Sequence, residues 1–206
     1  MLDGRDSMIG TREADVYFSV DVETDGPIPG PYSMLSFAVV YAGMYNGDHF
    51  RRADDYSDVF YTEIKPISDN YQSEALKVNG LDRDHLIAFA PKPSEAMERA
   101  YDWILGRTMG AAPVLVAYPL GFDWSWISWY FEAFCSRGSP FSHSRCFDLK
   151  TAVALTTGQT IARSGRSRLP AGLASNRSHT HHAVDDAIEQ ADIFANIFKW
   201  RKYEYR

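Results

Sequence analysis

Three apolar segments in the first third of the chain have the length and composition of β-strands. They cover residues 17–22, 34–45 and 59–64, and turn-rich or charged segments separate them. Strands that follow one another along a chain often lie side by side in the sheet. The pattern therefore predicts an antiparallel meander at the start of the fold.

Helices and short strands alternate after this meander. Residues 73–78 and 93–105 have apolar positions at helical spacing. Residues 114–117 then form a short apolar strand, and an aromatic-rich helix over residues 123–134 follows it. This alternation predicts parallel strands beside the meander, with helices packed on the sheet.

The clearest helical pattern lies at the end of the chain. A short strand-to-helix step over residues 147–156 precedes it, and residues 159–180 form a long segment without periodicity. Apolar residues then recur at i, i+3, i+4 and i+7 from Val184 to Phe198. Taken together, the elements predict an α/β fold in which helices flank a mixed β-sheet.

The composition of the chain indicates its domain organisation and the class of protein to which it belongs. The 206 residues, 45% of them apolar, suit a polar N-terminal tail over residues 1–15 and a single domain over residues 16–206. No segment has the roughly 18 apolar residues that a membrane span needs, so we expect no membrane partner. Cys135 and Cys146 are too few for a disulfide framework, which favours a cytoplasmic protein.

Two carboxylates stand one residue apart at the end of the first strand. Asp21 and Glu23 point to the same face of an extended chain, while Val22 points to the other. Like charges so close together are stable where water screens them at a surface or where a cation binds between them. The pair therefore indicates either a solvated strand end or a metal site.

Two further acids lie at predicted helix starts. Asp123 follows a short apolar strand, and Asp185 and Asp186 fall in the first turns of the last helix. Taken singly, each has an ordinary explanation, because acids cap helices and interact favourably with the helix dipole. Together with the strand pair, they form a pattern that capping explains poorly.

The joint pattern resembles the DEDDh branch of the DEDD 3′–5′ exonuclease superfamily. The segment SVDVETDG is similar to the family's first motif, Asp-x-Glu-Thr, and HHAVDDAIEQA is similar to its last motif, His-x-Ala-(apolar)-x-Asp-Ala. The resemblance spans roughly residues 17–198, and two weaker segments, EALKVNGL and FDLKTAVALTTGQT, are similar to the RNase T and oligoribonuclease group. It implies an RNase H-like mixed sheet and the hydrolysis of phosphodiester bonds.

The resemblance also implies the catalytic residues. Its metal ligands would be Asp21, Glu23, Asp123 and Asp186, and its general base would be His181. Hard oxygen ligands suit two Mg²⁺ or Mn²⁺ ions, which stabilise the attacking and leaving oxygens in phosphoryl transfer. The implied reaction releases nucleoside 5′-monophosphates from single-stranded RNA or DNA 3′ ends.

Spacing distinguishes the neighbouring histidines. His182 and Asp186 are four residues apart, so they would share one face of a continuous helix, whereas His181 would lie about 140° round the axis. His181 can therefore face the metals only from a loop or a frayed first turn, which is where the family places its catalytic histidine. His179 is a further candidate, and we do not expect His179, His181 and His182 to form a zinc site.

The resemblance suggests substrate contacts near the first motif. Thr24 and either Met34 or Leu35 would hold the terminal nucleotide, and Tyr32 would stack on a base. For Met34 and Leu35, packing in the core is the competing interpretation.

The sequence departs from the family at two places. Many relatives carry Ala-His-Asn-x-x-Phe-Asp, whereas Tyr118 and Pro119 replace the His-Asn pair here. Ser36 stands where a glutamate often follows in the second strand. The first departure affects substrate preference more than hydrolysis.

A basic segment separates Lys150 from Val184. It contains Arg163, Arg166, Arg168 and Arg177 and no acid, although the whole chain carries a net charge of -6. Such a segment is either a solvated loop or a contact for nucleic-acid phosphates, and we favour the second interpretation. Analogy with relatives also suggests a homodimer.

Two functions of other classes compete with exonuclease. A noncatalytic nucleic-acid-binding module on the same fold would explain the altered Tyr118-Pro119 segment, but such modules usually lose an acid. A phosphatase of the haloacid dehalogenase type would also end a strand in acids, but Glu23 stands where it needs a second aspartate.

Overall fold

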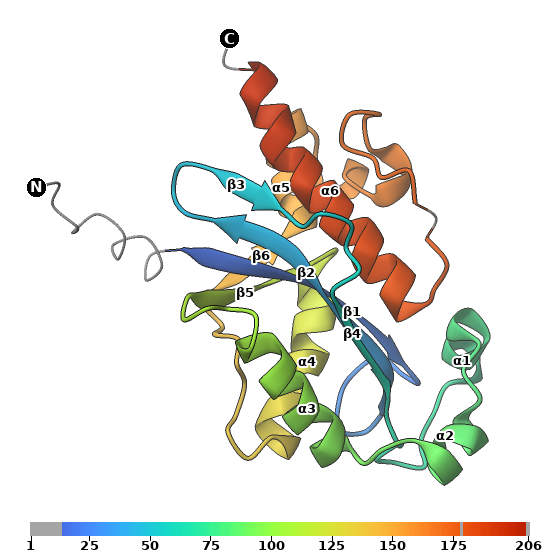
Figure 1. The fold of residues 1–206 in the computed structure, drawn as a ribbon. Coiled ribbons are helices and arrows are strands. Elements are labelled where there is room, and N and C mark those ends of the chain that lie inside the picture. Colours follow the sequence, from blue (N-terminus) through green and yellow to red (C-terminus); the bar gives the residue numbers. More distant parts are fainter. Residues whose placement is uncertain (1–13, 178, 205–206) are drawn as a thin grey trace, which may run out of the picture.

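The computed structural model describes residues 14–177 and 179–204, which are arranged around one mixed sheet (Figure 1). Its order is β3-β2-β1-β5-β6, and β4 also pairs with β2. The strand β1 is antiparallel to β2 and parallel to β5, which confirms the predicted combination of meander and parallel strands. The strands are β1 (Asp15–Thr24), β2 (Met34–Tyr45), β3 (Phe50–Arg52), β4 (Val59–Glu63), β5 (Ala112–Ala117) and β6 (Cys146–Asp148).

Helices cover both faces of the sheet. Figure 1 shows α6 across one face, with α5 beside it, while α3 and α4 lie on the other. The helices are α1 (Ser73–Asn79), α2 (Arg83–Phe89), α3 (Pro93–Leu105), α4 (Leu120–Phe134), α5 (Leu149–Thr157) and α6 (Ala183–Glu204), with short 3₁₀ helices η1 (Ile161–Arg163) and η2 (Arg166–Arg168). No helix of the described part is both long and apolar enough to cross a bilayer.

Alternation along β1 decides which face its acids occupy. Val20 and Val22 belong to the core cluster that includes α3 and α4, whereas Tyr17 belongs to the cluster that includes α6. Successive side chains of a strand point to opposite faces. Asp21 and Glu23 therefore project on the side of the sheet that α6 covers.

The helix α6 brings its first turn to this same side. Ala183, Ala187 and Ala191 are buried, and these small side chains let the helix lie close to the sheet. The helix contacts β1, β2 and β5. Its position against the sheet places Asp186, in the first turn, near the carboxyl end of β1.

A buried acid next to Asp21 and Glu23 has a structural role. The carboxylate of Asp25 accepts a hydrogen bond from the backbone nitrogen of Ser33 and lies 3.1 Å from Nε of Arg83 on α2. Asp25 is fully buried, so this pairing with Arg83 compensates the cost of removing its charge from water. The contact ties the β1–β2 connection to α2.

Besides the short 3₁₀ helices η1 and η2, the described part of the structure contains two elements that the sequence pattern does not predict. The strand β3 has only three residues, in a charged segment, and it extends the β2 hairpin through backbone pairing. The helix α2 buries only Leu86, so its apolar spacing is too weak to stand out. Of the predicted polar tail, residues 1–13 lie outside the described residues, and Asp15 already belongs to β1.

Candidate active site

All four predicted metal ligands line one open cavity of about 430 Å³ at the carboxyl end of β1. Segments that are distant in the chain meet here, because β1, α1, α4, η2 and the start of α6 all contribute to its wall. The side chains at the cavity include Asp21, Glu23, Thr24, Val78, Asn79, Tyr118, Phe122, Asp123, Arg166, His179, His181 and Asp186.

Three of the acids form a tight group. Asp21 and Glu23 from β1 and Asp186 from α6 each offer a carboxylate oxygen, and these oxygens lie within 4.8 Å of one another. Asp123, in the first turn of α4, accepts a hydrogen bond from the backbone nitrogen of Val22, at 3.2 Å. Because Val22 separates Asp21 from Glu23, this bond fixes the start of α4 against the acidic end of the strand.

A glutamine that the sequence analysis missed also belongs to this group. Gln190 lies one helical turn after Asp186, and its Nε2 donates a hydrogen bond of 2.7 Å to Oδ1 of Asp21. The side chain is fully buried, and its Oε1 has no hydrogen-bond partner among the described residues. The i, i+4 spacing from Asp186 was the signal that could have revealed it.

The loop before α6 wraps around the Asp186 carboxylate. The backbone nitrogens of Thr180 and His181 donate to its two oxygens at 2.9 Å and 3.1 Å. His181 adopts a left-handed conformation, with φ of 58°, which is unfavourable for a residue with a side chain. Because α6 begins at Ala183, His181 lies ahead of the helix, and its side chain lines the cavity.

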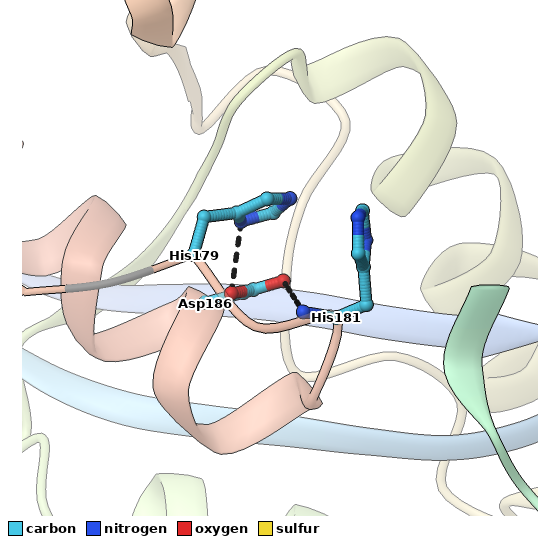
Figure 2. Close-up of side chains that lie close together, drawn as sticks. All are labelled: His179, His181 and Asp186. Atoms are coloured by element: carbon cyan, nitrogen blue, oxygen red, sulfur yellow. Dashed lines mark hydrogen bonds and ion pairs between the residues drawn. The ribbon is translucent and has the colours of Figure 1, made fainter.

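The three neighbouring histidines have different surroundings. Figure 2 shows the Asp186 carboxylate between His179 and His181, whose ring centres are 4.5 Å apart. Nδ1 of His179 lies 2.8 Å from Oδ1 of Asp186. This minor candidate therefore contacts Asp186 through its ring, whereas His181 bonds to Asp186 through its backbone nitrogen. The ring of His182 packs against Tyr61 instead, with 5.2 Å between ring centres.

The predicted nucleotide contacts divide between the cavity and the core. Thr24 lines the cavity, and its hydroxyl donates to the carbonyl of Gly26. Met34 and Leu35 are fully buried and do not line the cavity, which agrees with the competing interpretation of core packing. Tyr32 packs against the core cluster, with its ring so close to Gly26 that no side chain would fit there.

The three arginines predicted to contact the substrate also differ. Arg166 lines the cavity, whereas Arg163 and Arg168 are exposed on η1 and η2. Only Arg166 is therefore close to the carboxylates, and the other two present their charge to solvent.

Two exposed apolar side chains of the cavity were not predicted. Val78 on α1 is 56% exposed and Phe122 on α4 is 41% exposed. Beside them, Nδ2 of Asn79 donates to the backbone carbonyl of Thr24 at 3.0 Å. Exposed apolar residues such as these two have no signal in the periodicity, so the fold is needed to bring them to the site.

Burial raises the pKa of the clustered acids. Burial is the main reason that the pKa of Glu23 rises from its ordinary 4.5 to about 8, and the charges of Asp186 and Asp123 add to it. Burial likewise raises the pKa of Asp123 to about 7 and that of Asp21 well above its usual range. The carboxylates are therefore costly to ionise together unless a cation neutralises them.

These raised pKa values predict how the stability of the metal-free protein depends on pH. The folded state keeps the Glu23 proton at pH values where the unfolded chain has lost it, so the free energy of unfolding should fall as the pH rises from about 5 to about 8. The raised pKa of Asp123 should likewise make the free energy of unfolding fall as the pH rises. Urea unfolding in EDTA across this range measures the slope.

Glu23→Gln is the matched variant for this test. It keeps the size of the side chain and removes one titrating group, so the decrease with pH should be smaller than in the wild type. Wild-type stability that rises across the range, or an unchanged slope in the variant, would contradict the pKa assignment.

Comparisons with known proteins agree with this geometry. No family model matches the chain. The 3′–5′ DNA exonuclease Cap18 of Escherichia coli is 30% identical over 188 residues, which cover 91% of this chain and 94% of Cap18. Ribonuclease T of Baumannia cicadellinicola subsp. Homalodisca coagulata is 27% identical over 188 residues, which cover 89% of this chain and 84% of that enzyme.

A solved structure shows the same fold. The nuclease domain of 3′hExo, described as a DEDDh family member bound to rAMP, superposes with a TM-score of 0.63 at 13% identity. The match covers 91% of this chain and 92% of that domain, and it confirms the RNase H-like arrangement of the sheet and helices. From the fold and the similarity to Cap18, the chain belongs to the DEDDh superfamily of 3′–5′ exonucleases.

Proposed function

We propose that this exonuclease removes nucleotides from single-stranded 3′ ends with the help of two divalent ions, releasing nucleoside 5′-monophosphates. The observation that carries the proposal is the group of carboxylate oxygens from Asp21, Glu23 and Asp186, which lie within 4.8 Å of one another in an open cavity. An open site of this kind admits a strand end.

The residues present fit divalent ions. Asp21, Glu23, Asp123 and Asp186 would hold them, because carboxylate oxygens are the donors that Mg²⁺ and Mn²⁺ prefer. Burial raises the pKa of the first three, which is the expected behaviour of an anionic site that needs a cation. Bound ions of this kind lower the pKa of water and neutralise charge that develops on phosphoryl oxygens.

His181 is the proposed general base. Its ring lines the cavity, and it is held by the backbone bond from its own nitrogen to Asp186. In the reaction a water oxygen bonds to phosphorus, and the bond from phosphorus to the 3′-oxygen of the preceding nucleotide breaks. His181 accepts the proton of the water, and the departing 3′-oxygen takes a proton from the solvent.

The remaining wall of the cavity suits the terminal nucleotide. Val78 and Phe122 offer apolar surface for a base, and the backbone next to Thr24 offers polar groups. Arg163 and Arg168, exposed on η1 and η2, would attract the phosphates of the strand that leads into the cavity.

The first prediction is metal-dependent hydrolysis that needs Asp186. With Mg²⁺ or Mn²⁺, an oligonucleotide should lose mononucleotides from its 3′ end, and EDTA should stop the reaction. Asp186→Asn should lower the rate by at least about 10²-fold, because the site loses an anionic ligand. Matched DNA and RNA oligonucleotides, labelled at either end, are compared because Cap18 is named for DNA and Ribonuclease T for RNA.

Asp185→Asn is the control for this experiment. Asp185 also lies in the first turn of α6 but is exposed and bonds to the hydroxyl of Thr180, outside the carboxylate group. This variant should keep most of the activity. Equal activity in Asp186→Asn, or degradation from the 5′ end, would refute the proposal.

A second prediction separates the histidines. His181→Ala should lower kcat by about 10²- to 10⁴-fold, the usual effect of losing a general base. His182→Ala should change kcat little, because its ring lies against Tyr61 rather than in the cavity. Single-turnover rates measure both, and a larger loss in His182→Ala would show that the wrong histidine is assigned.

A third prediction concerns the exposed arginines. The double variant Arg163→Ala, Arg168→Ala should bind a single-stranded oligonucleotide more weakly, and its slope of log affinity against log salt should be shallower by about 0.7 per lost phosphate contact. Arg51→Ala, an exposed change on β3, serves as the charge control. An unaltered slope in the double variant would exclude these arginines from the strand path.

A further inference from the structure

Arg166 occupies a different environment from the other arginines of its segment. It begins η2, yet its side chain turns into the carboxylate cavity and is only 23% exposed. The charge of Arg166 lowers the pKa of both Asp21 and Asp123, against the stronger effect of burial. The guanidinium therefore lies within electrostatic range of two proposed metal ligands.

Three side chains surround this guanidinium. Its carbon Cζ lies 5.4 Å from the centre of the Tyr118 ring, a cation–π contact. Nη1 lies 3.1 Å from Nδ1 of His179, and Nε lies 3.5 Å from Oε2 of Glu189. Tyr118 also holds the backbone, because its hydroxyl donates to the carbonyl of Ser164, two residues before Arg166.

The pairing with Glu189 is looser than the structural ion pairs of the same molecule. Nε of Arg107 lies 2.7 Å and 2.8 Å from the two carboxylate oxygens of Asp58, whereas the distance to Glu189 is 3.5 Å. Both Nε of Arg166 and Oε2 of Glu189 are buried without a hydrogen-bond partner among the described residues. The ion pair with Glu189 therefore leaves Nε of Arg166 without a hydrogen bond.

Unused donors remain on Arg166 as a result. A guanidinium has five N–H donors in a planar fork that matches phosphate oxygens. Within the described chain, His179 is the only side chain that forms a hydrogen bond with it. The same ring nitrogen of His179 contacts Oδ1 of Asp186, so one atom separates the guanidinium from a proposed metal ligand.

We propose that Arg166 binds a non-bridging oxygen of the scissile phosphate and stabilises the charge that develops there, and that Tyr118 is the positioning residue for Arg166. This inference rests on the proposed function. It gives a role to Tyr118, which stands where the family motif has its His-Asn pair, because the aromatic ring supports a cation that the chain supplies from η2.

The first test uses a substrate with a single phosphodiester, the p-nitrophenyl ester of thymidine 5′-monophosphate. Without a flanking strand, any effect of Arg166 has to act at the reacting phosphate. Arg166→Ala should lower kcat by about 10²- to 10³-fold, as expected for the loss of one preorganised donor at the transition state, with a much smaller change in KM. Arg166→Lys should recover part of the loss, and Arg51→Ala should match the wild type.

Chemical rescue provides an independent measurement. Guanidinium added to the solution should raise the rate of Arg166→Ala and leave the wild-type rate unchanged, because only the variant has room for it in the cavity. Thermal unfolding of the variants shows that the compared proteins are folded.

A double-mutant cycle tests the positioning role of Tyr118. Tyr118→Leu removes the ring and should lower kcat by about 3- to 10-fold, whereas Tyr118→Phe keeps the ring and should lose less. In the Arg166→Ala background, Tyr118→Leu should cause no further loss, because no guanidinium remains to be positioned. A purely structural role would give the same loss in both backgrounds.

The outcomes separate the two proposals. If the wild type fails to hydrolyse any substrate with metal, both proposals fail. If the wild type is active and Arg166→Ala keeps its kcat, or changes only KM, the assignment of Arg166 alone is overturned. If the effects of Tyr118→Leu and Arg166→Ala are independent, Tyr118 is not the positioning residue.

Discussion

Mutual repulsion among closely spaced, at least partly buried carboxylates is the constraint on which the rest of the site depends. Asp21, Glu23 and Asp186 bring oxygens within 4.8 Å of one another, and burial raises the pKa of the first two. A fold that serves only stability would separate such groups or pair each with a cation, as it does for Asp25 with Arg83. The arrangement instead fits the divalent-cation site that we propose.

The scaffold holds these acids together through contacts between distant segments. The alternation of side chains along β1 directs Asp21 and Glu23 to the face of the sheet that α6 covers. The buried alanines of α6 bring Asp186 to that face. The bond from Val22 to Asp123 links β1 to α4, and the bond from Gln190 to Asp21 links β1 to α6. Each contact pairs residues more than 100 positions apart, so the site exists only in the folded chain.

The sequence pattern predicted the strands and helices whose own residues show a clear periodicity. The apolar strand that contains Asp21 and the amphipathic helix α6 have clear patterns in the sequence, and the mixed sheet follows from the order of the predicted elements. The helix α2, which buries only Leu86, and the contact of Gln190 with Asp21 depend on tertiary packing that no periodicity contains. Tyr118, which departs from the family motif, also depends on tertiary packing. Its ring contacts Arg166 because both residues line the same cavity in the folded chain.

The environment of Arg166 extends this account from metal binding to phosphate binding, because one cavity gathers both the acids and a cation without a tight partner. The most direct test of the central claim is a crystal structure with Mn²⁺ and a nonhydrolysed oligonucleotide, in which anomalous scattering locates the ions. The account predicts two manganese ions among Asp21, Glu23, Asp123 and Asp186. Manganese bound elsewhere, or an empty carboxylate group at saturating Mn²⁺, would contradict it.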